Sequence, residues 1–281
     1  MGRVPVDAWR MFTWLGDSGL LLPVAVFIAL VLLRVGHGLR RPALTWCVVF
    51  GACGLAVMAS KLAFMGWGIG SARFNFTGFS GHTAIGTALW PVALWLMATA
   101  WQRRHPRPVG MAPGEGAHSG AGAAIADRAD DRLRRAAVLA GWTLGGAIGI
   151  SRLALRAHSI SEVATGFLVG LVASTVFLAL VWRRTRPPRA HPALLLVLLV
   201  PLAFFGPDAP APTHQLLERI AMRMAGIDRP FKRMDLFGPE RGGTRGSVDA
   251  PRAGPPGGSS MPGGRNRTTF EPDIRKGGDD R

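Results

Sequence analysis

The sequence predicts an all-α membrane protein: a polytopic bundle of about six membrane-spanning helices with a short N-terminal interfacial helix. Hydrophobic residues make up 48% of the 281 residues and charged residues only 18%, below the roughly 25% typical of soluble globular domains. Six stretches carry no charge, and three of them approach the roughly 20 residues needed to cross the hydrocarbon of a bilayer. The net charge of +16 does not indicate nucleic-acid binding, because most basic residues form short runs between apolar stretches.

Each uncharged stretch is a candidate span. The second, third and fifth are the long ones, whereas the first, fourth and sixth need flanking polar residues or snorkelling arginines to complete a crossing. The sixth contains three prolines, and a re-entrant or interfacial segment is its alternative. In order, the stretches are Ser18–Leu33, Pro42–Ser60, Thr83–Gln102, Ala136–Ser151, Val163–Trp182 and Pro192–Pro207.

Regions on either side of the spans differ from them in composition. Aromatic residues in segment 1–17 indicate an interfacial helix at headgroup level. Residues 18–206 form the transmembrane domain. In 207–236, apolar residues recur at helical spacing between Leu216 and Met224, which predicts an amphipathic surface helix. Residues 237–281 are rich in Gly, Pro, Arg and Asp, and we expect them to be disordered.

The arginines predict the orientation of the bundle. They concentrate in the first, third and fifth connections between spans, which are therefore expected to face the cytoplasm. The second connection, about 61–82, and the fourth, 152–162, then face the outside of the inner membrane.

Isolated charges mark these two outer connections. Lys61 is the only lysine in the first 231 residues, and Glu162 is the only acidic residue between Asp131 and Asp208. Charge at membrane depth indicates a functional site. Polar residues in and beside the two connections include Lys61, Arg73, Ser80, His82, Ser151, Arg152, Arg156, His158, Ser161 and Glu162.

This set of side chains suits a phosphate ester. Lysine and arginine neutralise phosphoryl oxygens, two histidines can act as nucleophile and proton donor, and one carboxylate can orient an imidazole. Neither a Cys/His cluster nor a pair of carboxylates is present to hold a metal. The sequence therefore predicts metal-independent phosphoryl transfer without a cofactor.

Three motifs resemble those of the type 2 phosphatidic acid phosphatase superfamily. Residues 80–82, Ser-Gly-His, resemble its P-S-G-H motif. Residues 151–162 read Ser-Arg, five residues, His, three residues, Glu, and resemble its S-R-x5-H-x3-D motif. Lys61 matches the lysine that opens its K-x6-R-P motif. The resemblance covers about Lys61–Leu171 and implies a helical membrane phosphatase.

The resemblance also implies a role for each residue. His158 would attack phosphorus and become phosphohistidine, His82 would protonate the leaving oxygen, and Glu162 would hold the ring of His158. The phosphoryl oxygens would be bound by Lys61, Ser80, the amide of Gly81, and Arg152.

Three positions depart from the family pattern. Phe79 replaces a proline, Glu162 replaces an aspartate, and Gly68 stands where the first motif has its arginine. Arg73 is the other cation in the second connection, and we predict that it supplies the missing phosphate contact. Arg73→Ala would then cost about 2–4 kcal/mol in kcat/KM. The alternative is that Arg73 contacts lipid headgroups and that Arg156 binds the phosphate.

Simpler structural roles exist for some of these residues. Residues 159–162 form a capping-box pattern, which explains Glu162 without catalysis. Lys61 alone reads as a snorkelling interfacial lysine, and each histidine alone as a helix-start residue. Their occurrence together on one face favours the site.

The expected activity is hydrolysis of a lipid phosphomonoester or pyrophosphate at the outer face of the inner membrane. The expected partners are this lipid substrate and membrane lipids, without nucleic acid. Two alternatives are a catalytically degraded protein that binds or transports a phosphorylated lipid, and a vanadate-dependent, haloperoxidase-like oxidation. The sequence predicts no oligomeric state.

Overall fold

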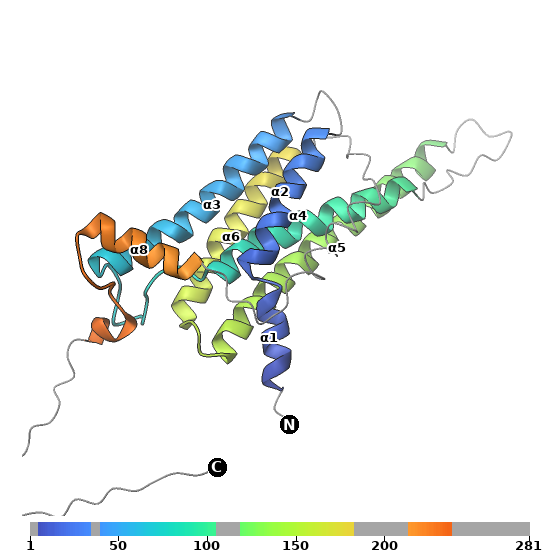
Figure 1. Cartoon of the computed structure of the whole chain (residues 1–281). Helices are drawn as coiled ribbons and strands as arrows, with labels where there is room; N and C mark the ends of the chain where they lie inside the picture. The colour runs from blue at the N-terminus through green and yellow to red at the C-terminus, as the bar shows by residue number, and fades with distance from the viewer. Residues whose placement is uncertain (1–4, 35–39, 105–118, 183–212, 238–281) are drawn as a thin grey trace, which may run out of the picture. The chain divides into compact units, whose positions relative to one another are not determined.

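A computed structural model describes residues 5–34, 40–104, 119–182 and 213–237, all within one compact unit, Met1–Glu240. Within these ranges the chain is helical, and its single β-bridge, Ser71 to Phe76, is isolated. The predicted all-α class is confirmed. The elements in Figure 1 are α1 (Val6–Trp14), α2 (Ser18–Arg34), α3 (Arg40–Trp67), α4 (Gly81–Arg104), α5 (Ser119–Ala154), α6 (Ile160–Val181), α8 (Thr213–Ala225) and the 3-10 helix η1 (Arg233–Phe237).

Five helices are long and apolar enough to cross a membrane, and they correspond to the first five predicted spans. Two extend beyond their uncharged stretches: α3 continues past Lys61 to Trp67, and α5 starts at Ser119, inside the third connection. The sixth stretch, Pro192–Pro207, and the tail from residue 238 lie outside the described residues. The chain is a multi-pass membrane protein.

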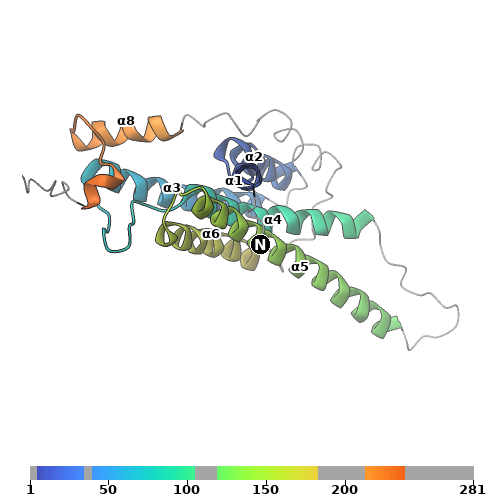
Figure 2. The ribbon, with the colours of Figure 1, turned by 90° about the horizontal axis from the view of Figure 1, so that it is seen from below.

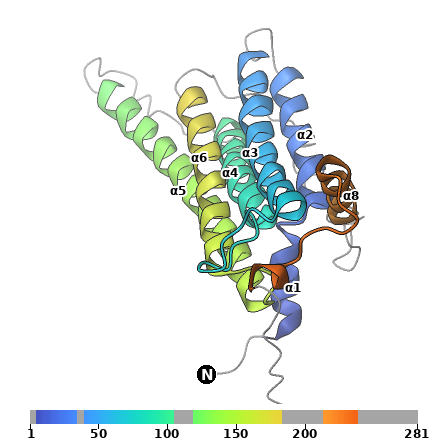
Figure 3. The same ribbon diagram turned by 90° about the vertical axis from the view of Figure 1, so that its left-hand side faces the viewer.

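Helix α4 is the centre of the bundle. Its apolar window is 72% buried, against at most 39% for the other four candidate spans. It packs against α2, α3, α5 and α6, and Figures 1 and 3 show these helices side by side. Because α4 touches each neighbour, the side chains at its N-terminal end share one region with the ends of α3, α5 and α6.

Glycines allow α5 and α6 to approach α4 closely. A Cβ atom on Gly141 of α5 would collide with the backbone of Pro91, and one on Gly170 of α6 would collide with the carbonyl oxygen of Ala84. Gly145 follows Gly141 by four residues, and Gly166 precedes Gly170 by four. Small residues at this spacing commonly allow close helix packing in membranes.

Substituting Gly170 therefore tests the packing. Gly170→Ala should lower the free energy of unfolding by about 1–3 kcal/mol, because its neighbour is rigid backbone. Gly51→Ala is the matched control, since no atom lies within 4 Å of a Cβ there. Thermal denaturation in detergent would measure both; equal melting temperatures for the two variants would contradict the packing.

The second and fourth connections meet at one end of the bundle. The backbone N–H of Ser80, just before α4, donates to the carbonyl of Glu162 in α6 at 3.0 Å. Ser159 caps α6, and the reciprocal capping box with Glu162 is present. Helix α8 packs against α3, and Figure 2 shows it beside that helix.

Candidate active site

A pocket of about 690 Å³ lies at this end of the bundle. It combines cationic, imidazole and carboxylate side chains with an apolar wall. Four of the predicted site residues line it, namely Lys61, His82, Arg152 and His158. Its other lining residues are Asp17, Ser18, Phe64, Met65, Thr77, Gly78, Ala157, Leu217, Glu218, Phe231, Lys232 and Arg233.

His158 is held in one orientation by Glu162. Its Nδ1 lies 2.7 Å from Oε2 of Glu162, and the side chain is 15% exposed. A carboxylate only accepts hydrogen bonds, so Nδ1 carries the proton and Nε2 keeps its lone pair. Burial lowers the pKa of His158 below the usual value of 6.5, and nearby Arg152 and Lys61 act in the same direction, while Glu162 opposes them. The ring is therefore suited to nucleophilic attack.

Glu162 is completely buried, and several donors surround its carboxylate. Thr77 donates from its N–H and its hydroxyl, and the backbone N–H of Ser159 donates at 3.1 Å. The Nη2 atom of Arg233 donates to both carboxylate oxygens, at 2.9 and 2.8 Å. Glu162 thus forms the capping box and contacts His158 at the same time, so the two interpretations of this residue do not exclude each other.

His82 also has a carboxylate nearby. Its Nε2 lies 3.5 Å from Oδ2 of Asp17, whose Oδ1 accepts from the N–H of Gly19 at the start of α2. Gly16 permits this approach, because a Cβ there would lie 3.1 Å from the backbone oxygen of His82 and 2.5 Å from Ile148. Both histidines that line the pocket therefore have a carboxylate partner.

The residues predicted to bind phosphate lie at different depths. Lys61 and Arg152 line the pocket, and Nε of Arg152 is buried without a hydrogen-bond partner among the described residues. The side chain of Ser80 is completely buried, and its hydroxyl lies 2.9 Å from the hydroxyl of Thr83. A Cβ on Gly81 would lie 3.8 Å from Nζ of Lys61, which places this first residue of α4 next to the pocket.

Arg73 is placed differently from the prediction. It is exposed, its guanidinium lies 5.5 Å from the ring centroid of Phe74, and it is not among the lining residues. Gly68 ends α3 in the left-handed conformation at φ 68°, and a Cβ there would lie 3.2 Å from the ring of Phe231. Phe231, which follows α8 in the chain, therefore fills the space beside Gly68, and no residue of the second connection does.

Sequence reasoning missed Asp17, Thr77, Lys232 and Arg233. Asp17 had a signal in the sequence, because no acidic residue follows it until Glu115. Lys232 had one as well, as one of only three lysines. Arg233 had none, since arginine is abundant and its contact lies 71 residues away.

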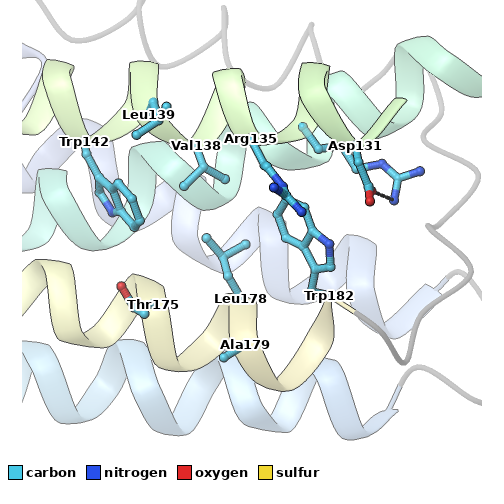
Figure 4. Close-up of a pocket in the computed structure, with 10 residues that line it drawn as sticks. Asp131, Arg135, Val138, Leu139, Trp142, Thr175, Leu178, Ala179 and Trp182 are labelled. Carbon is cyan, nitrogen blue, oxygen red and sulfur yellow. Dashed lines mark ion pairs between the residues drawn. The ribbon is translucent and has the colours of Figure 1, made fainter. Parts of the chain in front are cut away.

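A second pocket lies towards the other end of α5 and α6. Figure 4 shows Trp142, Leu178 and Trp182 lining it. Asp131 and Arg134 also line it and form an ion pair at 3.7 Å. Among its described lining residues there is no histidine, and the acidic one, Asp131, is paired. These residues therefore do not offer the groups that phosphoryl transfer needs.

Comparisons with known proteins identify the family of this chain. A family model described as the PAP2 superfamily matches residues 66–186. An uncharacterized 22.5 kDa protein in the cps region of Klebsiella pneumoniae is 38% identical over 233 residues, which cover 81% of this chain and 97% of that protein. The chain belongs to the PAP2 superfamily. No solved structure matches it.

PAP2 membership supports phosphatase-type activity for this chain. The matched region contains His82, Arg152, His158 and Glu162. It begins after Lys61 and ends before Arg233. In this PAP2 protein, residues on both sides of the matched region complete the pocket.

Proposed function

We propose that this protein hydrolyses a lipid phosphomonoester or pyrophosphate through a phosphohistidine intermediate on His158. The observation that carries the proposal is the hydrogen bond of 2.7 Å from Nδ1 of His158 to Glu162, inside a pocket that also contains Lys61 and Arg152. This hydrogen bond leaves Nε2 of His158 with its lone pair in a pocket that contains two cations, as an attack on a phosphoryl group requires.

In the first step, Nε2 of His158 forms a bond to phosphorus while the bond from phosphorus to the leaving oxygen breaks. Protonated His82 gives its proton to that oxygen, and Asp17 at 3.5 Å favours the protonated ring. Lys61 and Arg152 bind the phosphoryl oxygens, whose charge is distributed over three atoms in the transition state. The buried Nε of Arg152, which has no hydrogen-bond partner in the described part of the chain, supports this role.

In the second step, water attacks the phosphorus of phosphohistidine and the P–N bond breaks. His82, now neutral, accepts the proton of that water, and inorganic phosphate leaves the pocket. The same histidine therefore acts as acid in one step and as base in the next.

The pocket walls favour a lipid substrate. Phe64, Met65, Leu217 and Phe231 form an apolar side beside the cations. A polar head bound by the cations with an acyl or prenyl chain along this side satisfies both surfaces. Phosphatidic acid, phosphatidylglycerol phosphate and polyprenyl pyrophosphates are the candidates, by resemblance to the family.

The charge distribution supports a site at the outer face of the inner membrane. Arg40 and Arg41 begin α3, whereas Lys61 lies near its other end. On α5, Arg132 and Arg134 likewise precede Arg152 by several turns. Arginine-rich ends face the cytoplasm, so the pocket faces the opposite side.

A panel assay tests the proposed function. The purified protein in detergent micelles should release phosphate from at least one of the three lipids in the presence of EDTA, and vanadate should inhibit the release, because it mimics the pentacoordinate phosphoryl group. Tight binding of these lipids without phosphate release would favour a degraded binding protein. Halide oxidation that depends on peroxide and vanadate would favour the oxidase alternative.

A further inference from the structure

We infer that Arg233 is a positioning residue of the active site, so that the C-terminal segment 215–237 is part of the catalytic unit. Arg233 holds the carboxylate of Glu162, and Glu162 holds the imidazole of His158. The inference rests on the proposed function and adds a residue outside the region that the family model matches.

The contacts of Arg233 link three separate parts of the chain. Its Nη2 donates to both carboxylate oxygens of Glu162, at 2.9 and 2.8 Å, and lies 3.4 Å from the hydroxyl of Thr77. Its Nη1 donates to the carbonyl and side-chain oxygens of Asn75, at 3.1 and 2.7 Å. Asn75 adopts a positive φ of 48°, which turns the second connection towards this guanidinium. Arg233 therefore fixes this connection against Glu162.

Several contacts fasten the segment to the end of α3. The N–H of Phe231 donates to the carbonyl of Met65 at 2.9 Å, and its ring lies over Gly68. In α8, Ala221 is completely buried and its carbonyl approaches Gly66. A Cβ would lie 3.2 Å from the ring of Phe231 at position 68 and 3.3 Å from Ala225 at position 66, so the two glycines let this segment lie close to the end of α3.

The turn that carries Arg233 is organised by Asp235. Its carboxylate accepts from the backbone N–H of Lys232 at 2.7 Å and pairs with Arg229 at 3.2 Å. These two donors lower the pKa of Asp235. These contacts hold the turn in the conformation from which Arg233 reaches Glu162.

A guanidinium has a physical purpose at this position. Glu162 is a buried charge, and such a charge is costly unless it is paired and hydrogen bonded. An unpaired carboxylate would also repel a phosphate anion. Arg233 offsets the charge while leaving Oε2 within 2.7 Å of His158, so Glu162 orients the nucleophile at little electrostatic cost to substrate binding.

Substituting Arg233 tests the inference, using full-length protein and whichever lipid phosphate the panel identifies. Arg233→Ala should lower kcat about 10- to 100-fold, comparable with losing a group that orients a ligand at a metal site. Arg233→Lys should restore part of this loss, because it keeps the charge without the bidentate geometry. Added methylguanidine should rescue the alanine variant but not the lysine variant.

The pH profile separates positioning from a purely structural role. Around His158, Glu162 lies on α6, Arg152 on α5 and Lys61 on α3, and Arg233 acts through Glu162. The other charged or titratable residues that line the pocket are Asp17, His82, Glu218 and Lys232. Without Arg233, Glu162 attracts the proton of His158 more strongly. The acidic limb of kcat/KM should then move to higher pH, whereas a merely destabilised protein would lose activity without this movement.

Arg223→Ala is the matched control, since Arg223 is an exposed arginine of the same segment and does not line the pocket; it should stay within a few-fold of wild type. The inference would be overturned if Arg233→Ala kept the wild-type kcat and the wild-type acidic limb of kcat/KM. It would also be overturned if Arg73→Ala lost most activity instead, because Arg73 would then supply the positive charge that the first motif lacks at Gly68. Failure of the proposed function is distinguishable, because His158→Ala would then release phosphate as wild type does.

Discussion

Replacing His158 with alanine is expected to lower phosphate release by more than about 10⁴-fold, the scale seen when the nucleophile of a hydrolase is removed. The reason is that its Nε2 is the atom expected to bond to phosphorus, with Nδ1 committed to Glu162. Steady-state phosphate release in detergent micelles measures the effect. Thermal denaturation of the same sample checks that the variant is folded.

A phosphorylated intermediate provides the sharper readout. Wild-type protein given ³²P-labelled substrate and quenched in alkaline denaturant should retain label on His158. His82→Ala should still form labelled protein from an ester with a good leaving group, because that oxygen needs no proton. His105→Ala, in the arginine-rich third connection, is the control. Turnover of His158→Ala near the wild-type rate would exclude His158 as nucleophile.

The second large effect is expected for Glu162→Gln, which should lower kcat by about 10²- to 10⁴-fold, as when the carboxylate that orients a catalytic histidine becomes an amide. Glutamine keeps the shape, but its single oxygen can accept either from Thr77, as Oε1 does, or from Ser159, as Oε2 does, and it loses the charge that pairs with Arg233. Its NH₂ group can also donate to His158 and stabilise the wrong tautomer. Steady-state kinetics and thermal denaturation, measured together, show which property changes more.

Ser159→Ala is the matched control for Glu162→Gln. It removes the other half of the capping box, the acceptor for the N–H of Glu162 at 3.4 Å, without touching the carboxylate oxygens. It should lower stability by about 1 kcal/mol and leave turnover within a few-fold. If Glu162→Gln lost stability and turnover in equal measure, capping would be the whole role of the residue.

Local sequence patterns were enough to predict the bundle. A long uncharged apolar stretch has few options in a bilayer other than a helix, because every backbone polar group must be satisfied internally. Five of the predicted stretches are therefore helices long and apolar enough to cross a membrane. The helix ends were less predictable, since α3 and α5 continue through charged residues such as Lys61 and Arg128. A charged side chain can remain in a helix when its polar end reaches an interface or a polar pocket.

Some residues of the candidate site could be predicted from the sequence, and others could not. His82, Arg152, His158 and Glu162 lie within two short motifs at the starts and ends of apolar stretches, so sequence by itself determined them and their location at one end of the bundle. Only the tertiary structure placed Asp17 beside His82, Arg233 on Glu162, and Arg73 outside the pocket. The physical reason is that these placements depend on close approaches at Gly16, Gly66 and Gly68 between segments far apart in sequence. Hydrophobic periodicity and short motifs contain no information about such distances.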